Sequence, residues 1–169
     1  IGDRMLIDWG DGTTPELVIS TGSYPMHIYE SSYIWKIVDV KICGKCRHIF
    51  YNNNTSLNSI NELVSVVSWG NVGFTSFLNS FYGCKNLTSI PKTPVTGCLD
   101  VESVSGMFMD CINLVLIIPD NFLQNMPNLR LADNMFNNCR RINYHAPETL
   151  FINNPNITTP DLFEKSLLN

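Results

Sequence analysis

The sequence predicts a mainly β fold with short helices, made of a small β-sandwich over residues 1–51 and a stack of short repeats over residues 52–169. Three observations lead to this fold class. Residues 1–51 consist of short apolar runs separated by turn-forming residues, which is typical of a sandwich of short strands. A polar segment, 52–56, then marks a change in composition. Beyond it one apolar pattern returns at a nearly fixed period, which indicates stacked repeats.

The first part is expected to consist of short strands joined by tight turns. The turn signal is strongest at residues 10–13, because glycine adopts positive φ easily and aspartate hydrogen-bonds nearby backbone. Apolar residues within 33–42 switch parity, which favours a bulge or a strand buried on both sides. The strands are expected over residues 5–9, 17–19, 26–29, 33–42 and 47–51.

The second part contains a repeated unit of the form Phe-x-x-Cys-x-x-Leu-x-x-Ile, followed by proline. Pro91 and Pro119 are separated by 28 residues, as are Cys111 and Cys139. An earlier copy places Cys84 27 residues before Cys111. A period in the twenties is typical of leucine-rich-type repeats, in which each unit adds one short strand to the stack. The sequence therefore predicts a right-handed solenoid of about three to four units.

The recurring apolar side chains are expected to form the core of this stack, because one unit cannot bury its own apolar face. Proline after each apolar run is expected to end the strand, since it has no N–H to donate. Residues 160–169 carry apolar side chains at helical spacing, which predicts either a further unit or a cap. The expected core residues are Phe81, Cys84, Leu87, Phe108, Cys111, Leu114, Phe136 and Cys139.

The cysteines are not expected to bind a metal. Those that recur once per unit are expected to be small buried hydrophobic residues. Cys43 and Cys46 form a lone Cys-x-x-Cys, whereas a structural zinc site needs four ligands. Two interpretations of this pair stay open, namely free thiols and a disulfide.

The polar residues of the first part are expected to be structural. Asp8 and Asp11 lack the further carboxylates of a calcium site and fit a turn held by carboxylate-to-backbone hydrogen bonds. His27 is expected to make a structural hydrogen bond. Sequence signatures of nucleophilic or metal-dependent catalysis are absent. The sequence therefore predicts a protein that is not an enzyme and that needs no cofactor and no metal.

Charge excludes some partner classes. The chain has a formal net charge of −4, a pI of about 5.2 and only 15 % charged residues. Nucleic-acid binding needs a basic surface, so no nucleic-acid partner is expected. No run of 18 apolar residues is present, so no membrane-spanning segment is expected in this fragment.

The repeated motif, preceded by Gly106-Met107 or Asn134-Met135, resembles BspA-like leucine-rich-repeat surface proteins of bacteria. The resemblance covers roughly residues 57–169. It implies a secreted or surface-anchored protein that serves adhesion or host-protein binding, with no catalytic residues. The signal and the anchor of such a protein are expected outside this fragment.

The first part resembles a PKD-type β-sandwich. The matching residues are Asp8-Trp9-Gly10-Asp11-Gly12-Thr13, then His27-Ile28-Tyr29, then Trp35-Lys36-Ile37. Tyr33 stands where the family has glycine, so a different local turn is expected there. The first strand of a full domain is expected to be missing or truncated before Ile1.

The expected function is recognition or adhesion, outside the cell or at its surface, through an extracellular protein or glycan ligand. The alternatives are a structural spacer and an accessory domain of a larger secreted protein or enzyme. Tyr144 with Arg140 and Arg141 is the best candidate hot spot, because Tyr and Arg dominate binding energetics. In an alternative interpretation, an irregular neighbouring strand buries Leu116 and Ile118. The strand positions expected to face outward are Thr88, Leu116, Ile118, Asn143 and Tyr144.

Overall fold

A computed structural model describes residues 4–19, 27–33, 36–49, 62–143, 146–157 and 161–163 of the chain. The chain separates into two compact units, Ile1–Cys46 and Arg47–Asn169. It is mainly β, with short strands in the first unit and isolated parallel bridges in the second. Among the described residues, helix is confined to the 3₁₀ turn η1, Ser31–Tyr33. The prediction of a mainly β chain is confirmed, and the expected short helices reduce, in the described part, to this turn.

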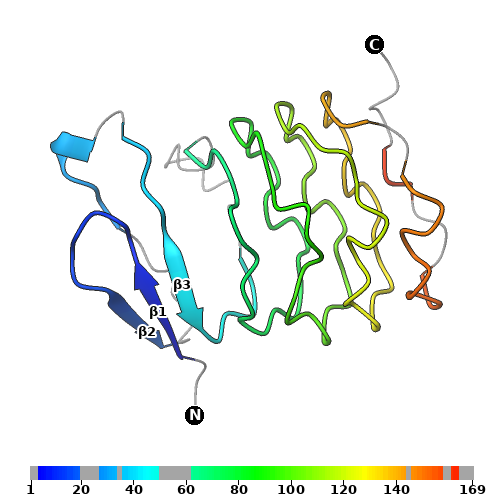
Figure 1. Cartoon of the computed structure of the whole chain (residues 1–169), viewed down its shortest axis with the longest axis horizontal. Coiled ribbons are helices and arrows are strands. Elements are labelled where there is room, and N and C mark those ends of the chain that lie inside the picture. The colour runs from blue at the N-terminus through cyan, green and yellow to red at the C-terminus, as the bar shows by residue number, and fades with distance from the viewer. Residues whose placement is uncertain are drawn as a thin grey trace. The chain divides into compact units, whose positions relative to one another are not determined.

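The first unit contains a three-stranded antiparallel sheet in the order β2-β1-β3 (Figure 1). Its strands are β1 (Arg4–Asp8), β2 (Glu16–Ile19) and β3 (Lys41–Gly44). The first two agree within one residue with the predicted strands. The turn predicted at residues 10–13 lies in the β1–β2 connection, where Gly10 and Gly12 have φ of 76° and 84°. These left-handed conformations explain the two glycines of this turn.

The strand predicted over residues 33–42 is not formed as expected. Residues 36–40 have no regular structure, and β3 begins only at Lys41. Ile37 is 81 % exposed and Val40 is 40 % exposed, so this apolar run is not buried on both sides. The apolar pattern was misleading because a strand needs a partner, and of this run only the part that belongs to β3 pairs with β1.

Two further strand predictions are wrong for the residues that the structure describes. Residues 27–30 and 47–49 form no strand. The predicted boundary between residues 51 and 52 lies outside the described residues. Arg47 belongs to the second unit, where its carbonyl accepts a 2.9 Å hydrogen bond from the Thr75 amide.

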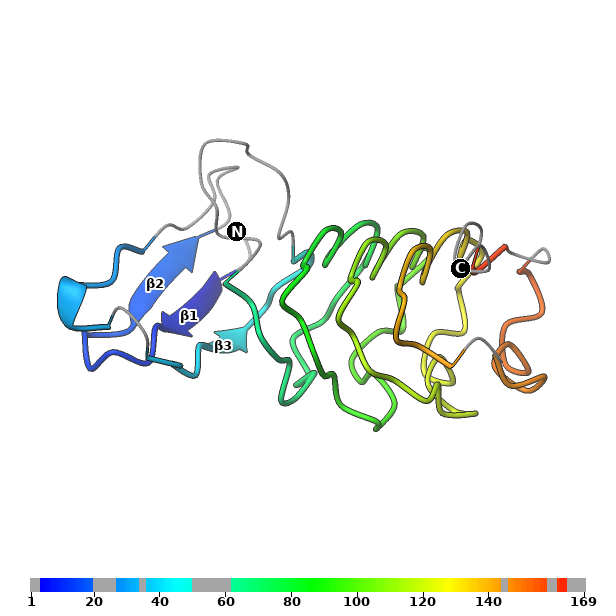
Figure 2. The same cartoon turned by 90° about the horizontal axis from the view of Figure 1, so that it is seen from above.

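In the second unit, successive turns of the chain lie side by side and are joined by backbone hydrogen bonds (Figures 1 and 2). The Phe77 amide donates to the Ser103 carbonyl, and the Val104 amide donates to the Leu131 carbonyl, each over 2.9 Å. Each bond therefore joins one repeat to the next. The parallel bridges are Ser65↔Ser89, Ser103↔Leu131 and Leu116↔Ile142.

Left-handed residues recur at equivalent places in the repeats. Gly106 and Asp110 flank Phe108 with φ of 61° each, and the neighbouring repeats have the same arrangement. Asn, Asp and Gly are the residues that tolerate this conformation, so the chain turns sharply around each phenylalanine. The equivalent pairs are Asn79 with Gly83, Gly106 with Asp110, and Asn134 with Asn138.

The predicted core residues of the repeats are all buried, each at 2 % exposure or less. The phenylalanine rings form a ladder, in which Phe81 and Phe108 stack with centroids 5.4 Å apart. The Cys111 thiol donates to the Phe81 carbonyl over 3.1 Å, and the Cys139 thiol donates to the Phe108 carbonyl over 2.9 Å. The cysteines thus act as small buried residues that also satisfy a backbone carbonyl of the preceding repeat.

Candidate functional site

The short extended segment at residues 114–118 corrects one expectation about the binding surface. Leu116 and Ile118 were expected to face outward, with burial as the alternative, and the structure has them buried, at 3 % and 4 % exposure. Val115 and Ile117 face outward instead, at 59 % and 69 % exposure. The repeat that contains Leu114 and Pro119 has one residue more between its leucine and its proline than the preceding repeat, and this insertion shifted the predicted phase of the alternation.

The outward side chains of neighbouring repeats form one surface. Val115 donates its amide to the Thr88 carbonyl over 3.0 Å. Arg141 precedes Ile142, which bridges to Leu116, so Arg141 occupies the position next to Val115 in the following repeat. We call Thr88, Val115, Ile117 and Arg141, all exposed, the exposed row.

The remaining predicted site residues lie near this row. Arg140 is exposed, and its Nε donates to the Asn138 Oδ1 over 3.2 Å. Asn143 is exposed and donates its amide to the Leu116 carbonyl over 3.2 Å. Tyr144 lies outside the described residues. Val115 and Ile117 were missed because residues 114–118 are all apolar, so the sequence has no alternation of apolar and polar residues that would mark the outward side chains.

A second surface feature lies where the chain turns after each repeat proline. A hollow of about 420 Å³ opens beside Trp69, and a second of about 270 Å³ opens beside Leu150. Gln124 lines both hollows, so they are neighbours. We call the two together the edge groove. Its lining is Ser68, Trp69, Gly70, Thr93, Pro94, Thr96, Asp120, Asn121, Gln124, Asn125, Thr149, Leu150, Ile152 and Asn153.

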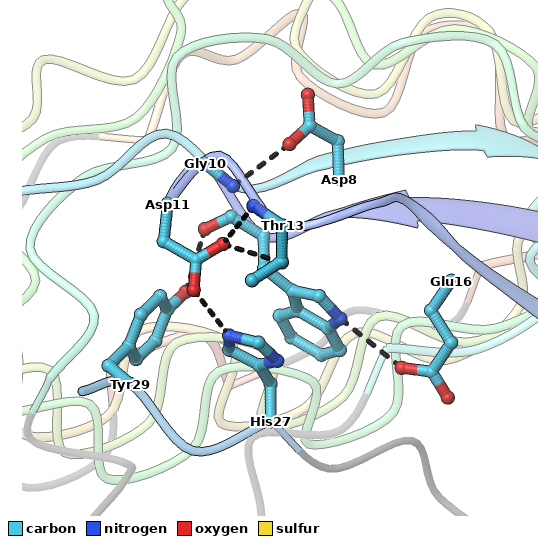
Figure 3. A network of polar contacts seen from close by, with 8 residues as sticks. Asp8, Gly10, Asp11, Thr13, Glu16, His27 and Tyr29 are labelled. Atoms are coloured by element: carbon cyan, nitrogen blue, oxygen red, sulfur yellow. Dashed lines mark hydrogen bonds and ion pairs between the residues drawn. The ribbon is translucent and has the colours of Figure 1, made fainter.

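The first unit carries a compact polar network around its β1–β2 turn (Figure 3). The Asp11 carboxylate accepts from the Thr13 amide over 3.1 Å and from the Thr13 hydroxyl over 2.6 Å. Its other oxygen lies 2.7 Å from His27 Nε2. Asp8 accepts a 2.9 Å bond from the Gly10 amide. The predicted carboxylate-to-backbone bonds and the predicted His27 hydrogen bond are therefore confirmed.

Aromatic rings complete this network. The Trp9 and His27 rings stack with centroids 4.9 Å apart, and Tyr29 meets His27 edge-on. The Tyr29 hydroxyl donates to the Trp9 carbonyl over 2.9 Å, and Trp9 Nε1 donates to Glu16 over 3.2 Å. These contacts tie residues 27–29 to the β1–β2 turn, and they give the network a structural role.

The hydrogen-bond partners of Asp11 stabilise its negative charge. The hydrogen bonds from the Thr13 and His27 side chains lower the pKa of Asp11 from 3.8 to about 2. Asp11 therefore stays ionised at any pH above this value, and its carboxylate remains a hydrogen-bond acceptor for the turn.

The cysteines show where thiol chemistry is possible. Cys43 is an exposed free thiol, so it is not linked to Cys46, which is buried. Cys84, Cys98, Cys111 and Cys139 are buried free thiols. Among the described residues, no three His, Cys, Asp or Glu side chains gather to hold a metal ion.

Comparisons with protein-family models, with curated proteins and with solved structures find no match to this chain. Within the part of the chain that the structure describes, no helix has the length and apolar character needed to cross a bilayer.

Proposed function

We propose that the chain is a non-enzymatic recognition or adhesion module of an extracellular or cell-surface protein. In this proposal residues 47–169 form a leucine-rich-type solenoid that binds an extracellular protein or glycan. Residues 1–46, which precede it in the sequence, form a PKD-like β domain. The exposed row is the ligand-binding surface.

The contacts between repeats support the solenoid. The Phe108 amide donates to the Met135 carbonyl, and the Phe81 amide donates to the Met107 carbonyl, each over 2.9 Å. Asparagine side chains also join neighbouring repeats. The side-chain amide of Asn113 donates to the Lys85 carbonyl over 2.9 Å. Regular bonds between neighbouring repeats are the pattern that a solenoid requires.

The turn network supports the PKD-like assignment. The Asp8-Trp9-Gly10-Asp11-Gly12 segment, on which the resemblance rests, forms one hydrogen-bonded turn with His27 and Tyr29. The resembling residues from two separate segments thus meet in one structural cluster. A purely accidental likeness would not require them to be in contact.

The exposure of Val115 and Ile117 carries the functional proposal. Two branched apolar side chains, 59 % and 69 % exposed, stand on one short segment between Thr88 and Arg141. Exposed apolar side chains that cluster mark interaction surfaces, and arginine is among the residues enriched in binding hot spots. The bonds to Thr88 and Asn143 fix this segment, so little ordering entropy opposes binding.

A binding screen tests this proposal. The purified chain is measured against extracellular-matrix proteins, plasma proteins and a glycan array, beside the double variant Val115→Ser, Ile117→Ser. Leu99→Ser is the matched control, because Leu99 is 67 % exposed and lies outside the exposed row. We expect the double variant to lose at least tenfold in affinity and the control to keep full affinity.

Two outcomes would count against the exposed row. If the double variant binds as tightly as the parent, the site lies elsewhere on the chain. If the folded parent binds nothing at micromolar or tighter affinity, the spacer function takes precedence. Circular dichroism and urea unfolding of each variant confirm that the fold is retained.

A further inference from the structure

The three-stranded sheet of the first unit has two faces of different exposure. Residues directly opposite each other on neighbouring strands point to the same side of a sheet, and side chains alternate along each strand. The apolar side chains of one face are buried or half-buried, namely Met5, Ile7, Val18 and Ile42. We call the opposite face the open face, and it carries Arg4, Leu6, Asp8, Leu17, Ile19, Lys41 and Cys43.

An apolar row crosses the middle of the open face. Leu6 pairs with Leu17 on one side and with Cys43 on the other, so the three side chains lie in register across the sheet. Leu6 is 42 % exposed and Leu17 is 60 % exposed, and Cys43 is an exposed free thiol. Ile19, which is 44 % exposed, extends the apolar surface beside Leu17. The solvent face of an antiparallel sheet is ordinarily polar, so this apolar cluster marks an interaction surface.

Two opposite charges flank this row along β1. Arg4 lies two residues before Leu6 and Asp8 lies two residues after it, on the same face of the strand. Within the part of the chain that the structure describes, neither residue forms an ion pair. The described contacts of Asp8 occupy only its Oδ1, which accepts from the Gly10 amide. The strand therefore presents a cation, an apolar centre and an anion at equal spacing.

This order makes the open face complementary to itself. A two-fold axis along the Leu17–Leu6–Cys43 row turns a second copy over, so that its β1 lies antiparallel across the β1 of the first. Each Arg4 then faces Asp8 of the other copy, while Leu6 faces Leu6 and Leu17 faces Leu17. Two sheets that pack face to face lie about 10 Å apart, a distance at which side chains from both sheets meet.

An axis parallel to the strands fits less well. It would place Arg4 on Arg4 and Asp8 on Asp8, and like charges brought together oppose association. The axis along the row has one unfavourable feature, since it brings Lys41 towards Lys45, which follows β3 and pairs with Arg4. Both lysines lie on the β3 side of the sheet, and such long side chains can extend into water.

We propose that the open face is a homodimer interface, in which two copies of the chain pack their first-unit sheets face to face about an axis along the Leu17–Leu6–Cys43 row. This interface is separate from the proposed ligand-binding surface, because it uses residues of the first unit alone. A dimer would carry the exposed row twice, and two linked sites bind a repetitive ligand more tightly than one.

Sedimentation equilibrium of the whole chain tests the association across the micromolar range, with a reductant present. We expect a monomer–dimer equilibrium. Leu17→Lys puts a charge into the apolar row and should raise the dimer dissociation constant by about tenfold or more. Ile37→Lys is the matched control and should leave the constant unchanged, because Ile37 is 81 % exposed in the same unit and lies outside the sheet.

Charge reversal tests the pairing of Arg4 with Asp8. Arg4→Glu and Asp8→Lys should each weaken self-association, because each places two pairs of like charges in the dimer. An equal mixture of the two variants should associate again, since every pair then joins opposite charges. Circular dichroism checks that Asp8→Lys, which loses the contact to the Gly10 amide, remains folded. The Leu17→Lys test does not depend on that variant.

The exposed thiol reports the orientation of the two copies. An axis along the row places Cys43 opposite Cys43 at the separation of two packed sheets, so a short bis-maleimide should link the copies covalently. Cys43→Ser should abolish the linked product, because the other described cysteines are buried and react slowly. A dimer that forms without this cross-link has another orientation and contradicts the proposed axis.

The proposal is overturned if the folded chain stays monomeric throughout the micromolar range, or if Leu17→Lys leaves the dimer intact. It is also overturned if the chain is monomeric and its open face binds lipid vesicles or another protein in a way that Leu17→Lys abolishes. Loss of the dimer in Leu17→Lys, with the Cys43 cross-link in the parent and full association of Ile37→Lys, would establish the open face as the interface.

Discussion

The Phe108 ring lies parallel to the Phe136 ring, with centroids 5.8 Å apart and 5° between the planes. The ladder continues to Phe81 on one side, and from Phe136 to Phe163 on the other, where the spacing is again 5.8 Å. Each inner ring of the ladder, Phe108 and Phe136, therefore packs against a ring on both sides. In such a stack, stability is close to a sum of repeats and their contacts, so an inner ring contributes to two contacts at once.

Truncating an inner ring should be costly for this reason. Phe108→Ala should lower the free energy of unfolding by about 3–5 kcal/mol, the usual range for a buried phenylalanine. Phe163→Ala, at a half-buried position, should cost clearly less. Urea unfolding followed by circular dichroism measures both. Equal losses at the two positions would contradict a ladder in which contacts add up along the stack.

The repeat core was predictable because identical residues recur where identical contacts are made. Phe108 and Cys111 have equivalents on both sides, and a side chain that stacks on its own copy leaves a periodic signal in the sequence. The positions beside them, Gly106 and Asp110, also recur as Asn, Asp or Gly, since each repeat needs left-handed residues there.

Other features could not be predicted from the sequence, because they depend on a partner segment or on a single inserted residue. Ile37 and Val40 have the pattern of a strand, yet nothing in the sequence says that pairing with β1 begins only at residue 41. The extra residue before Pro119 reversed the expected orientation of Leu116. The edge groove is lined by turns of different repeats, so no local sequence pattern predicts it.

The buried thiols predict a loss of stability in alkali. Burial raises the pKa of Cys84, Cys98 and Cys139 to about 12 and also raises that of Cys111, from an ordinary value of 9.0. A raised pKa means that the folded state keeps protons that the unfolded state has lost. The stabilisation is therefore complete below pH 9.0 and is lost as the pH rises towards 12.

Two measurements test this prediction. The midpoint of urea unfolding should fall as the pH rises above 9.0. Cys98→Ala should make this fall less steep, because one thiol fewer then differs in protonation between the folded and unfolded states. At neutral pH, Ellman's reagent should react quickly with Cys43 and slowly with the buried thiols. Rapid reaction of Cys111 or Cys139 in the native protein would contradict their burial.

Acid should affect the first unit through Asp11. Its pKa is lowered to about 2, first by the Thr13 side chain and then by His27. A lowered pKa means that the stabilisation is complete above pH 3.8 and is lost as the pH falls through about 2. Carboxyl carbon shifts measured by NMR should give an Asp11 midpoint near pH 2. Thr13→Val should raise this midpoint, and a parent midpoint near 3.8 would contradict the network.

Gly106 offers a test of how closely neighbouring repeats approach. Its φ is +61°, and a Cβ built there would lie 2.1 Å from the Asn79 Oδ1 of the preceding repeat. Gly106→Ala should therefore cost the left-handed penalty of about 1–2 kcal/mol and, in addition, the displacement of the Asn79 side chain. Gly70→Ala is the matched control, since Gly70 has φ of +64° and its nearest neighbour would be 3.8 Å away.

A second substitution separates the two costs at Gly106. Asn79 itself has φ of 54°, so Asn79→Gly keeps a residue suited to that conformation and removes the obstructing side chain. In the double variant Asn79→Gly, Gly106→Ala, the penalty for alanine should fall to that measured for Gly70→Ala. Urea unfolding of the four chains gives this coupling directly. If the two substitutions are additive, the side chains of successive repeats do not meet at this point and the close approach is wrong.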